Sequence, residues 1–141
     1  MKGDVDIQSV ALAFRSAFEG VELHDAPGSL PIFPQGCCSW ATWMLGHYLK
    51  LELSLDPQEI EAQRTDDGGQ CAHAWLGVSG LTVDITADQF PDGPARVVVA
   101  AISPWHARWN VIRVANIRPI SFVDSCSMSG YAKPSEIYER L

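Results

Sequence analysis

The chain has 141 residues, of which 47% are hydrophobic and 19% are charged, and its formal net charge is −7. This size and composition allow a hydrophobic core, so we expect one globular domain spanning residues 1–141. The acidic balance argues against a nucleic-acid partner, which needs clustered Lys and Arg, and no stretch approaches the ~18 apolar residues that would span a membrane.

An amphipathic helix is expected at the start of the chain. Hydrophobic side chains recur there at spacings of three and four, the repeat of one helical face, and the pattern ends near Gly20. They are Ile7, Val10, Ala11, Phe14, Ala17 and Phe18. The segment Asp25–Gly36 then carries three prolines and two glycines, which no helix or central strand tolerates. We expect a loop there.

A second, largely buried helix is expected from Cys37 to Lys50, because its hydrophobic residues share one helical face. The break at Gly36 sets its start, which places Cys37 and Cys38 in or just before the first turn. Free N–H groups and the partial positive charge at a helix N-terminus favour a thiolate and can stabilise an oxyanion. A cysteine in this position is therefore a candidate nucleophile.

The middle and the end of the chain are predicted to form a small antiparallel sheet. Two β-type runs, CAHAWLGV and LTVDIT, are joined by Ser79-Gly80, a pair that suits a tight hairpin turn. Further strands are expected at Glu59–Thr65, as a short edge strand, and at Arg96–Ile102, Val111–Ala115 and Ile117–Phe122. The segment after Lys133 is expected to be a short helix or a tail.

The hairpin places a histidine and an aspartate on one face of the sheet. With a two-residue turn, Trp75 faces Asp84, so Asp84 lies diagonally from His73. Diagonal neighbours are about 7–8 Å apart, which two extended side chains can bridge. Asp84 can then hold one ring nitrogen of His73 while the other nitrogen faces a thiol, as in a triad of nucleophile, base and orienting acid.

Three blocks in this order, FPQGCC, AHAWLGV and VDITADQF, resemble the Cys, His and Asp blocks of transglutaminase-like proteins within the papain-like superfamily. The resemblance covers residues 33–90. It implies an α+β, papain-like (transglutaminase-like) fold, in which a central helix carrying the nucleophile packs on a small antiparallel sheet. Compared with animal transglutaminases the chain is far shorter and lacks an acidic cluster for calcium, which argues against cross-linking activity.

Carried over one residue at a time, the resemblance implies Cys38 as nucleophile, His73 as base and Asp84 as orienting acid. It also implies three residues at the substrate site: Trp75, Gln35 and Gly36. Gln35 lies too close to Cys38 in sequence to match the glutamine of papain's oxyanion hole. Cys37 and Asp88 are the alternatives for the nucleophile and the acid.

Of the remaining cysteines, Cys71 is expected to be a packed residue, with a redox or regulatory role as the alternative, and Cys126 is expected to lie in a polar loop without a role. Cys71 and Cys126 have no paired CxxC spacing, so no metal site is expected, and the thiols are expected to be reduced. His106, flanked by Trp105 and Trp109, is expected on the surface or in the core, with a place beside a substrate cleft as the alternative.

These residues predict a thiol-dependent hydrolase that acts on an amide bond, as a peptidase or protein-glutamine deamidase, through a Cys-His-Asp triad and an acyl-enzyme, without a cofactor. The alternatives are an acyltransferase that cross-links proteins and a catalytically silent binding module of the same fold. The expected partner is a protein or peptide substrate. Because the N-terminus is too polar for a secretory signal, we expect a cytoplasmic protein. An effector exported without a signal peptide, with a host-target or regulatory protein as partner, is compatible with this reading.

Overall fold

The computed structural model describes residues 2–20, 38–66 and 69–117. The elements in chain order are α1 (Lys2–Gly20), α2 (Cys38–Leu53), β1 (Gln58–Asp66), β2 (Gly69–Val78), β3 (Leu81–Asp84), the 3₁₀ turn η1 (Ala87–Gln89), β4 (Val98–Ala100), α3 (Pro104–Ala107) and β5 (Asn110–Asn116). Within these ranges, no helix has the length and apolar character needed to cross a membrane. The expected α+β class is confirmed.

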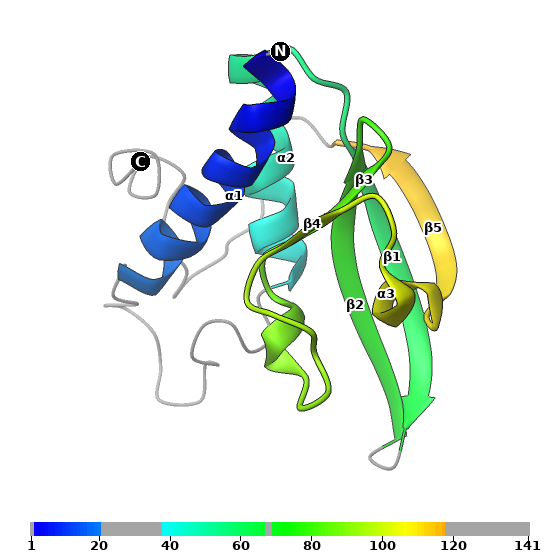
Figure 1. Ribbon diagram of the computed structural model, residues 1–141. Helices are drawn as coiled ribbons and strands as arrows, with labels where there is room; N and C mark the ends of the chain where they lie inside the picture. The colour runs from blue at the N-terminus through cyan, green and yellow to red at the C-terminus, as the bar shows by residue number, and fades with distance from the viewer. Residues whose placement is uncertain (1, 21–37, 67–68, 118–141) are drawn as a thin grey trace.

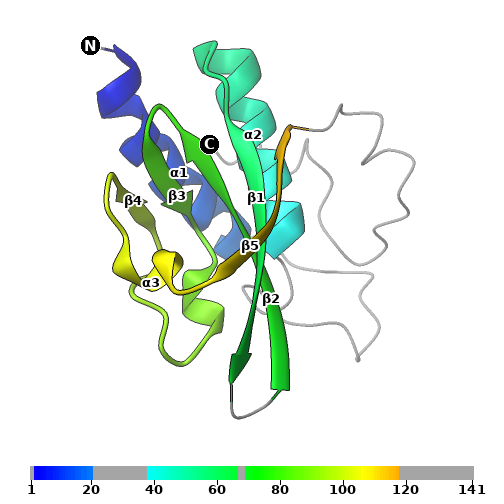
Figure 2. The same cartoon turned by 90° about the vertical axis from the view of Figure 1, so that its right-hand side faces the viewer.

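The five strands form one sheet in the order β4-β3-β2-β1-β5, and every neighbouring pair is antiparallel. The helices α1 and α2 lie side by side against one face of this twisted sheet, whereas the short helix α3 lies on the other (Figure 1). The view turned by 90° shows the long β1–β2 hairpin crossing in front of α2 (Figure 2). The central strands β2 and β3 therefore contact both layers.

A mainly aliphatic core lies between the two long helices and the sheet. Its most deeply buried members include Ile7, Phe14, Trp43, Met44, Leu45, Leu49, Leu76 and Val83. Ile7 and Phe14 belong to the hydrophobic spacing that predicts α1. Burial of each large side chain contributes about 1.5–3 kcal/mol to folding. This core fixes α2 against β2, the strand that carries His73.

The β2–β3 hairpin has the turn and the register that the sequence predicts. Ser79 and Gly80 both have positive φ, 53° and 77°, as the two central residues of a type I′ turn require. Val78 pairs with Leu81, and the ladder ends two residues further along each strand. Neighbouring strand residues point to opposite faces. The even-numbered residues of β2 therefore face the helices, and the odd-numbered ones, His73 among them, face α3.

Two of the expected strands differ from the structure. The prediction of Glu59–Thr65 as a short edge strand is wrong, because β1 spans nine residues and pairs with β2 on one side and β5 on the other. The charged residues of β1 led to the expectation of an edge strand. Two of them, Glu59 and Glu61, accept hydrogen bonds from Arg113 of the neighbouring strand β5. The strand expected at Arg96–Ile102 is reduced to β4.

The expected first helix and the strand at Val111–Ala115 are confirmed as α1 and β5. The second expected helix begins at Cys38 and ends at Leu53. The loop expected at Asp25–Gly36 and the segment after Lys133 lie outside the described residues, as does nearly all of the strand expected at Ile117–Phe122.

Candidate active site

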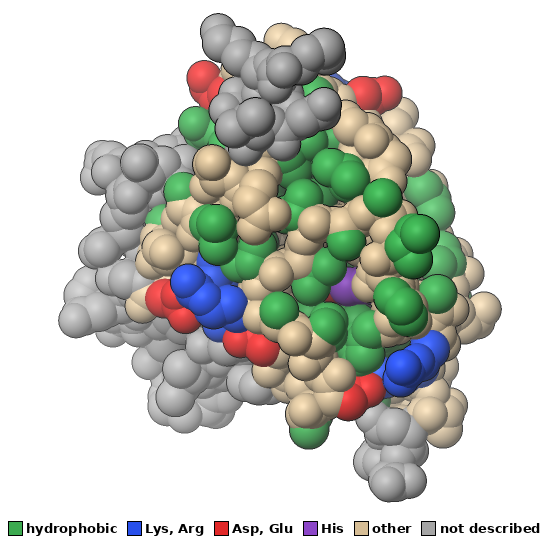
Figure 3. All heavy atoms as spheres, viewed as in Figure 1, with side chains coloured by type: hydrophobic (Ala, Val, Ile, Leu, Met, Phe, Trp, Pro, Cys, Tyr) green, Lys and Arg blue, Asp and Glu red, His purple; other side chains and the backbone are tan. Residues whose placement is uncertain are grey.

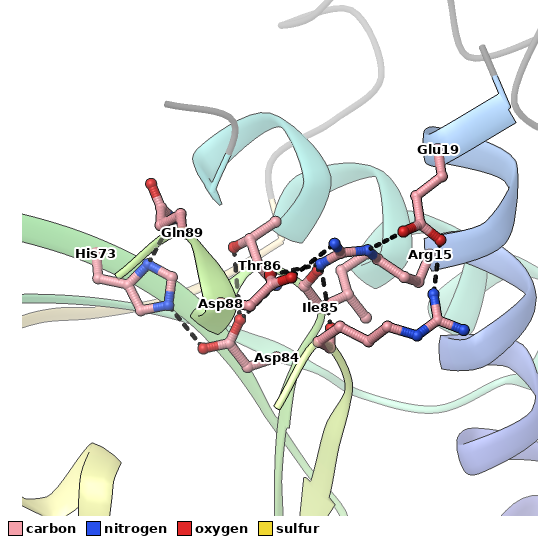
Figure 4. A network of polar contacts seen from close by, with 9 residues as sticks. Arg15, Glu19, His73, Asp84, Ile85, Thr86, Asp88 and Gln89 are labelled. Atoms are coloured by element: carbon pink, nitrogen blue, oxygen red, sulfur yellow. Dashed lines mark hydrogen bonds and ion pairs between the residues drawn. The ribbon is translucent and has the colours of Figure 1, made fainter. Parts of the chain in front are cut away.

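The centre of the site is the contact between His73 on β2 and Asp84 at the end of β3. The Nε2 atom of His73 lies 2.6 Å from Oδ2 of Asp84, and both residues are only 2% exposed. The predicted diagonal placement across the hairpin is therefore confirmed (Figure 4). The sheet register alone brings together this histidine and this aspartate.

The carboxylate of Asp84 accepts hydrogen bonds at both oxygens. Oδ2 also lies 2.7 Å from Nε2 of His106, and Oδ1 accepts the backbone N–H of Thr86 at 2.9 Å. Burial alone would raise the pKa of Asp84, but the hydrogen bonds from His106 and His73, the charge of His73 and the Thr86 backbone bond lower this pKa to about 2. Asp84 is therefore ionised at neutral pH and only accepts hydrogen bonds.

This charge state determines which ring nitrogens carry protons. An ionised carboxylate has no hydrogen to donate, so Nε2 of His73 and Nε2 of His106 must each donate to it. In the neutral rings Nδ1 then carries the lone pair. The amide nitrogen of Gln89 lies 3.3 Å from Nδ1 of His73, and the Ser103 hydroxyl lies 2.5 Å from Nδ1 of His106, so each can donate to a lone pair. Nδ1 is therefore the basic atom of His73.

Aromatic rings surround His73 on the face that carries α3. Four ring centroids lie 5.0–5.8 Å from that of the imidazole: Phe90, Trp109, Trp75 and Trp105. The His73 side chain has no exposed surface. In the space-filling view, hydrophobic side chains gather over the middle of this face, with charged groups around them (Figure 3). Such an environment excludes water and strengthens the interaction between His73 and Asp84.

An ion pair lies over the outer side of these rings. The guanidinium carbon of Arg64, on β1, is 4.5 Å from the ring centroid of Trp109 and 5.2 Å from that of Phe90. Arg64 donates two hydrogen bonds to Asp92, at 2.9 and 2.7 Å, and Asp92 also accepts one from the Trp105 indole. The bonds from Arg64 are the main reason that the pKa of Asp92 is lowered to about 2. This ion pair links β1 to the segment between η1 and β4.

The candidate nucleophile, Cys38, is the first residue of α2, and its side chain lies outside the described part of the structure. The first turns of α2 are held on β2 by a hydrogen bond of 3.2 Å from the Thr42 hydroxyl to the carbonyl oxygen of Ala74. Ala74 lies beyond the end of the β2–β3 ladder, which stops at Leu76. Cys38 precedes Thr42 by about one helical turn, and the Thr42 hydroxyl binds Ala74, the residue next to His73 on β2.

The other predicted residues fall into three groups. Cys37, Gln35 and Gly36 lie outside the described residues. Trp75 is 3% exposed and packs in the aromatic cluster, and its role in substrate binding stays a prediction. Asp88 is wrong as the alternative acid, because its two oxygens bind the guanidinium of Arg15 at 2.6 and 2.7 Å, away from His73 (Figure 4).

The three residues His73, Asp84 and His106 each offer one metal-ligating atom, and these atoms lie within 4.8 Å of one another. Two of the three separations, 2.6 and 2.7 Å, are those of hydrogen bonds. Ligands bound to zinc at about 2.0–2.2 Å must stand further apart than this around the ion. In this arrangement the three side chains form a hydrogen-bonded group, which would have to spread to hold a metal.

Sequence reasoning missed His106 and Gln89 as members of the site. In the sequence, only the flanking tryptophans drew attention to His106. No linear pattern shows that its ring contacts Asp84, because His106 lies in α3, which follows η1 and β4 in the chain. Gln89 lies five positions after Asp84, and its side chain reaches back to His73 because η1 reverses the chain.

No family model, curated protein or solved structure matches the chain.

Proposed function

We propose that the protein is a thiol-dependent hydrolase acting on an amide bond, with Cys38 as nucleophile, His73 as base and Asp84 as the acid that orients it. The observation that carries the proposal is the buried hydrogen bond between Nε2 of His73 and an ionised Asp84. It leaves Nδ1 of His73 without a bond to Asp84, on β2, the strand whose opposite face packs against the first turns of α2. A papain-like fold and the residue roles of the transglutaminase-like resemblance belong to the same proposal.

In the proposed reaction Nδ1 of His73 takes the thiol proton, and the thiolate of Cys38 attacks the amide carbonyl to form a C–S bond. The free N–H groups at the start of α2 stabilise the oxyanion. When the C–N bond breaks, the imidazolium returns its proton to the leaving amine. Water, deprotonated by His73, then cleaves the thioester and regenerates the thiol. Asp84 stabilises the imidazolium throughout and keeps the proton on Nε2.

Ser103 is a second candidate nucleophile, because its hydroxyl bonds to Nδ1 of His106 and His106 bonds to Asp84. We favour Cys38, because α3 has only four residues and offers no long helix whose N-terminus could hold an oxyanion at Ser103. A fluorophosphonate probe, which modifies activated serines, should leave Ser103 unlabelled. Labelling of Ser103 that is lost in His106→Gln would give it the role of nucleophile.

The decisive experiment is labelling of the native protein with iodoacetamide across a pH series, read by peptide mass spectrometry. We expect rapid labelling confined to Cys38 below about pH 7, because an ion pair with a histidine lowers a thiol pKa from its usual ~8.5. The labelling should be lost in His73→Ala and weakened in Asp84→Asn. Cys37→Ser is the matched control and should label like the wild type.

Slow, alkaline labelling that is spread over the cysteines and is indifferent to His73→Ala would overturn the proposal and favour a silent binding module. If Cys38 is activated, incubation with a glutamine-containing peptide separates the remaining alternatives. Release of ammonia alone indicates deamidation, cleavage of the peptide indicates a peptidase, and incorporation of an added amine indicates acyl transfer.

A further inference from the structure

The carboxylate of Asp84 serves two histidines, although the proposed chemistry uses only one. Nε2 of His73 and Nε2 of His106 converge on the same oxygen, at 2.6 and 2.7 Å. Their rings are nearly parallel, with an interplanar angle of 26° and centroids 6.5 Å apart. The other oxygen is occupied by Thr86. Asp84 is thus oriented from three sides, and one of these is His106.

We propose that His106 is a positioning residue of the His73–Asp84 pair, which fixes the carboxylate and limits how much of its negative charge acts on His73. This inference rests on the proposed function for its catalytic meaning. The hydrogen-bonded arrangement itself does not depend on Cys38.

His106 is itself held in one orientation. It is buried in α3, where its ring packs edge-on against Trp75 at 4.7 Å and Trp105 at 4.8 Å. Ser103, at the position before α3, makes no capping bond to the helix and instead directs its hydroxyl to Nδ1 of His106. The lone pair at Nδ1 is thereby satisfied, and the N–H at Nε2 is aimed at Asp84.

The energetic consequence follows from counting charges. One proton added to the two imidazoles balances the carboxylate, whereas a second would place two buried cations against one anion. Ionisable groups that interact this closely exchange protons in steps that belong to the set and not to one member. A charge-assisted donor on Asp84 also competes with His73 for the same oxygen. Removal of His106 should therefore leave His73 the stronger base.

Among the residues that the structure describes, two charged groups near the pair have fixed partners. Arg64 on β1 is paired with Asp92, and Asp88 on η1 is paired with Arg15. Gln89 is neutral. A thiol on the same strand, β2, is that of Cys71. Replacing Cys38 with alanine removes the one thiol that the proposed function couples to His73.

The test is an NMR titration of the histidine rings in a Cys38→Ala background, with His106→Phe and His106→Gln as variants and Ser103→Ala as control. In the parent we expect the His73 signal to shift in two steps. His106→Phe should leave one step in the His73 signal, with its midpoint about one pH unit above the upper step of the parent. This shift corresponds to the free energy of one charge-assisted hydrogen bond. His106→Gln, which offers Asp84 a neutral N–H, should return the midpoint toward the parent.

An unchanged or lowered His73 midpoint in both His106 variants would overturn the proposal, and so would a single step in the parent. Ser103→Ala keeps the imidazole and should preserve the two steps. The same variants with Cys38 intact show whether the coupling reaches the thiol. The iodoacetamide labelling rate of Cys38 should change at the pH at which His73 loses its proton, and this pH should be higher in His106→Phe. Absence of rapid Cys38 labelling in the wild type would end the proposed function, and the ring titration would still decide the role of His106.

Discussion

Two polar networks meet on the short segment that follows β3, and they differ in the groups that donate their hydrogen bonds (Figure 4). Arg15 of α1 donates to the carbonyl of Ile85 at 2.8 Å and to both oxygens of Asp88. On the other side, Asp84 accepts from two imidazoles whose remaining nitrogens contact an amide and a hydroxyl. A guanidinium does not lose its proton at ordinary pH, whereas imidazoles do. The first network can only hold the segment in place, and the second can move protons.

The largest effect is expected from breaking the network around Arg15. Arg15→Met should lower the free energy of unfolding by about 3 kcal/mol, because it leaves a partly buried Asp88 and two backbone carbonyls without their cation. Chemical denaturation with urea measures this loss. The double variant Arg15→Met/Asp88→Asn should recover part of it, since no unpaired charge then remains.

Arg96 provides the matched control, because it forms an ion pair with Glu19 between side chains that are 48% and 43% exposed. Arg96→Met should cost less than about 1 kcal/mol, as exposed ion pairs contribute little. Equal losses in Arg15→Met and Arg96→Met would mean that burial does not distinguish the two arginines, and the structural role given to Arg15 would fail.

A smaller, pH-dependent effect is expected from the titratable network. The folded protein keeps Asp84 ionised down to a pKa of about 2, whereas in the unfolded chain its carboxyl group has the usual pKa of 3.8. The stabilisation is therefore complete above about pH 4 and is lost as the pH falls toward 2, by about 2 kcal/mol in all. Urea unfolding of the wild type between these pH values should show the decline, and Asp84→Asn should flatten it. An equally steep decline in Asp84→Asn would assign the acid sensitivity to other carboxylates.

The difference between these networks also explains how much could be predicted from the sequence. His73 and Asp84 are separated by a turn whose two residues fix the register, so simple alternation along two strands places their side chains together. The start of α2 at Cys38 follows from the break before it. Local rules suffice where a single hairpin or a single helix end decides the position.

The partners from further along the chain needed the complete fold. Arg15 precedes Asp88 by 73 positions, and no periodicity of α1 shows that the buried Arg15 points at η1. His106 reaches Asp84 only because β4 pairs with β3 and α3 follows directly after it. The position of β1 between two strands was also not predicted, because two of its charged residues, Glu59 and Glu61, are paired with Arg113 of a strand that comes much later.

The smallest effect is expected at Arg64 and Asp92, which lie at the rim of the aromatic cluster, where their side chains are 15% and 48% exposed. Arg64→Met keeps a long side chain over Trp109 and removes the charge, so it should lower the free energy of unfolding by about 1 kcal/mol or less. Asp92→Asn removes the ion pair and keeps the cation over the ring. If the ion pair makes the larger contribution, the two variants should lose similar stability at low salt and approach the wild type at high salt, where exposed charges are screened. If instead contact with the rings stabilises the cluster, Arg64→Met alone should remain less stable at high salt, and the aromatic surround of His73 would then depend on a cation that stands outside both networks.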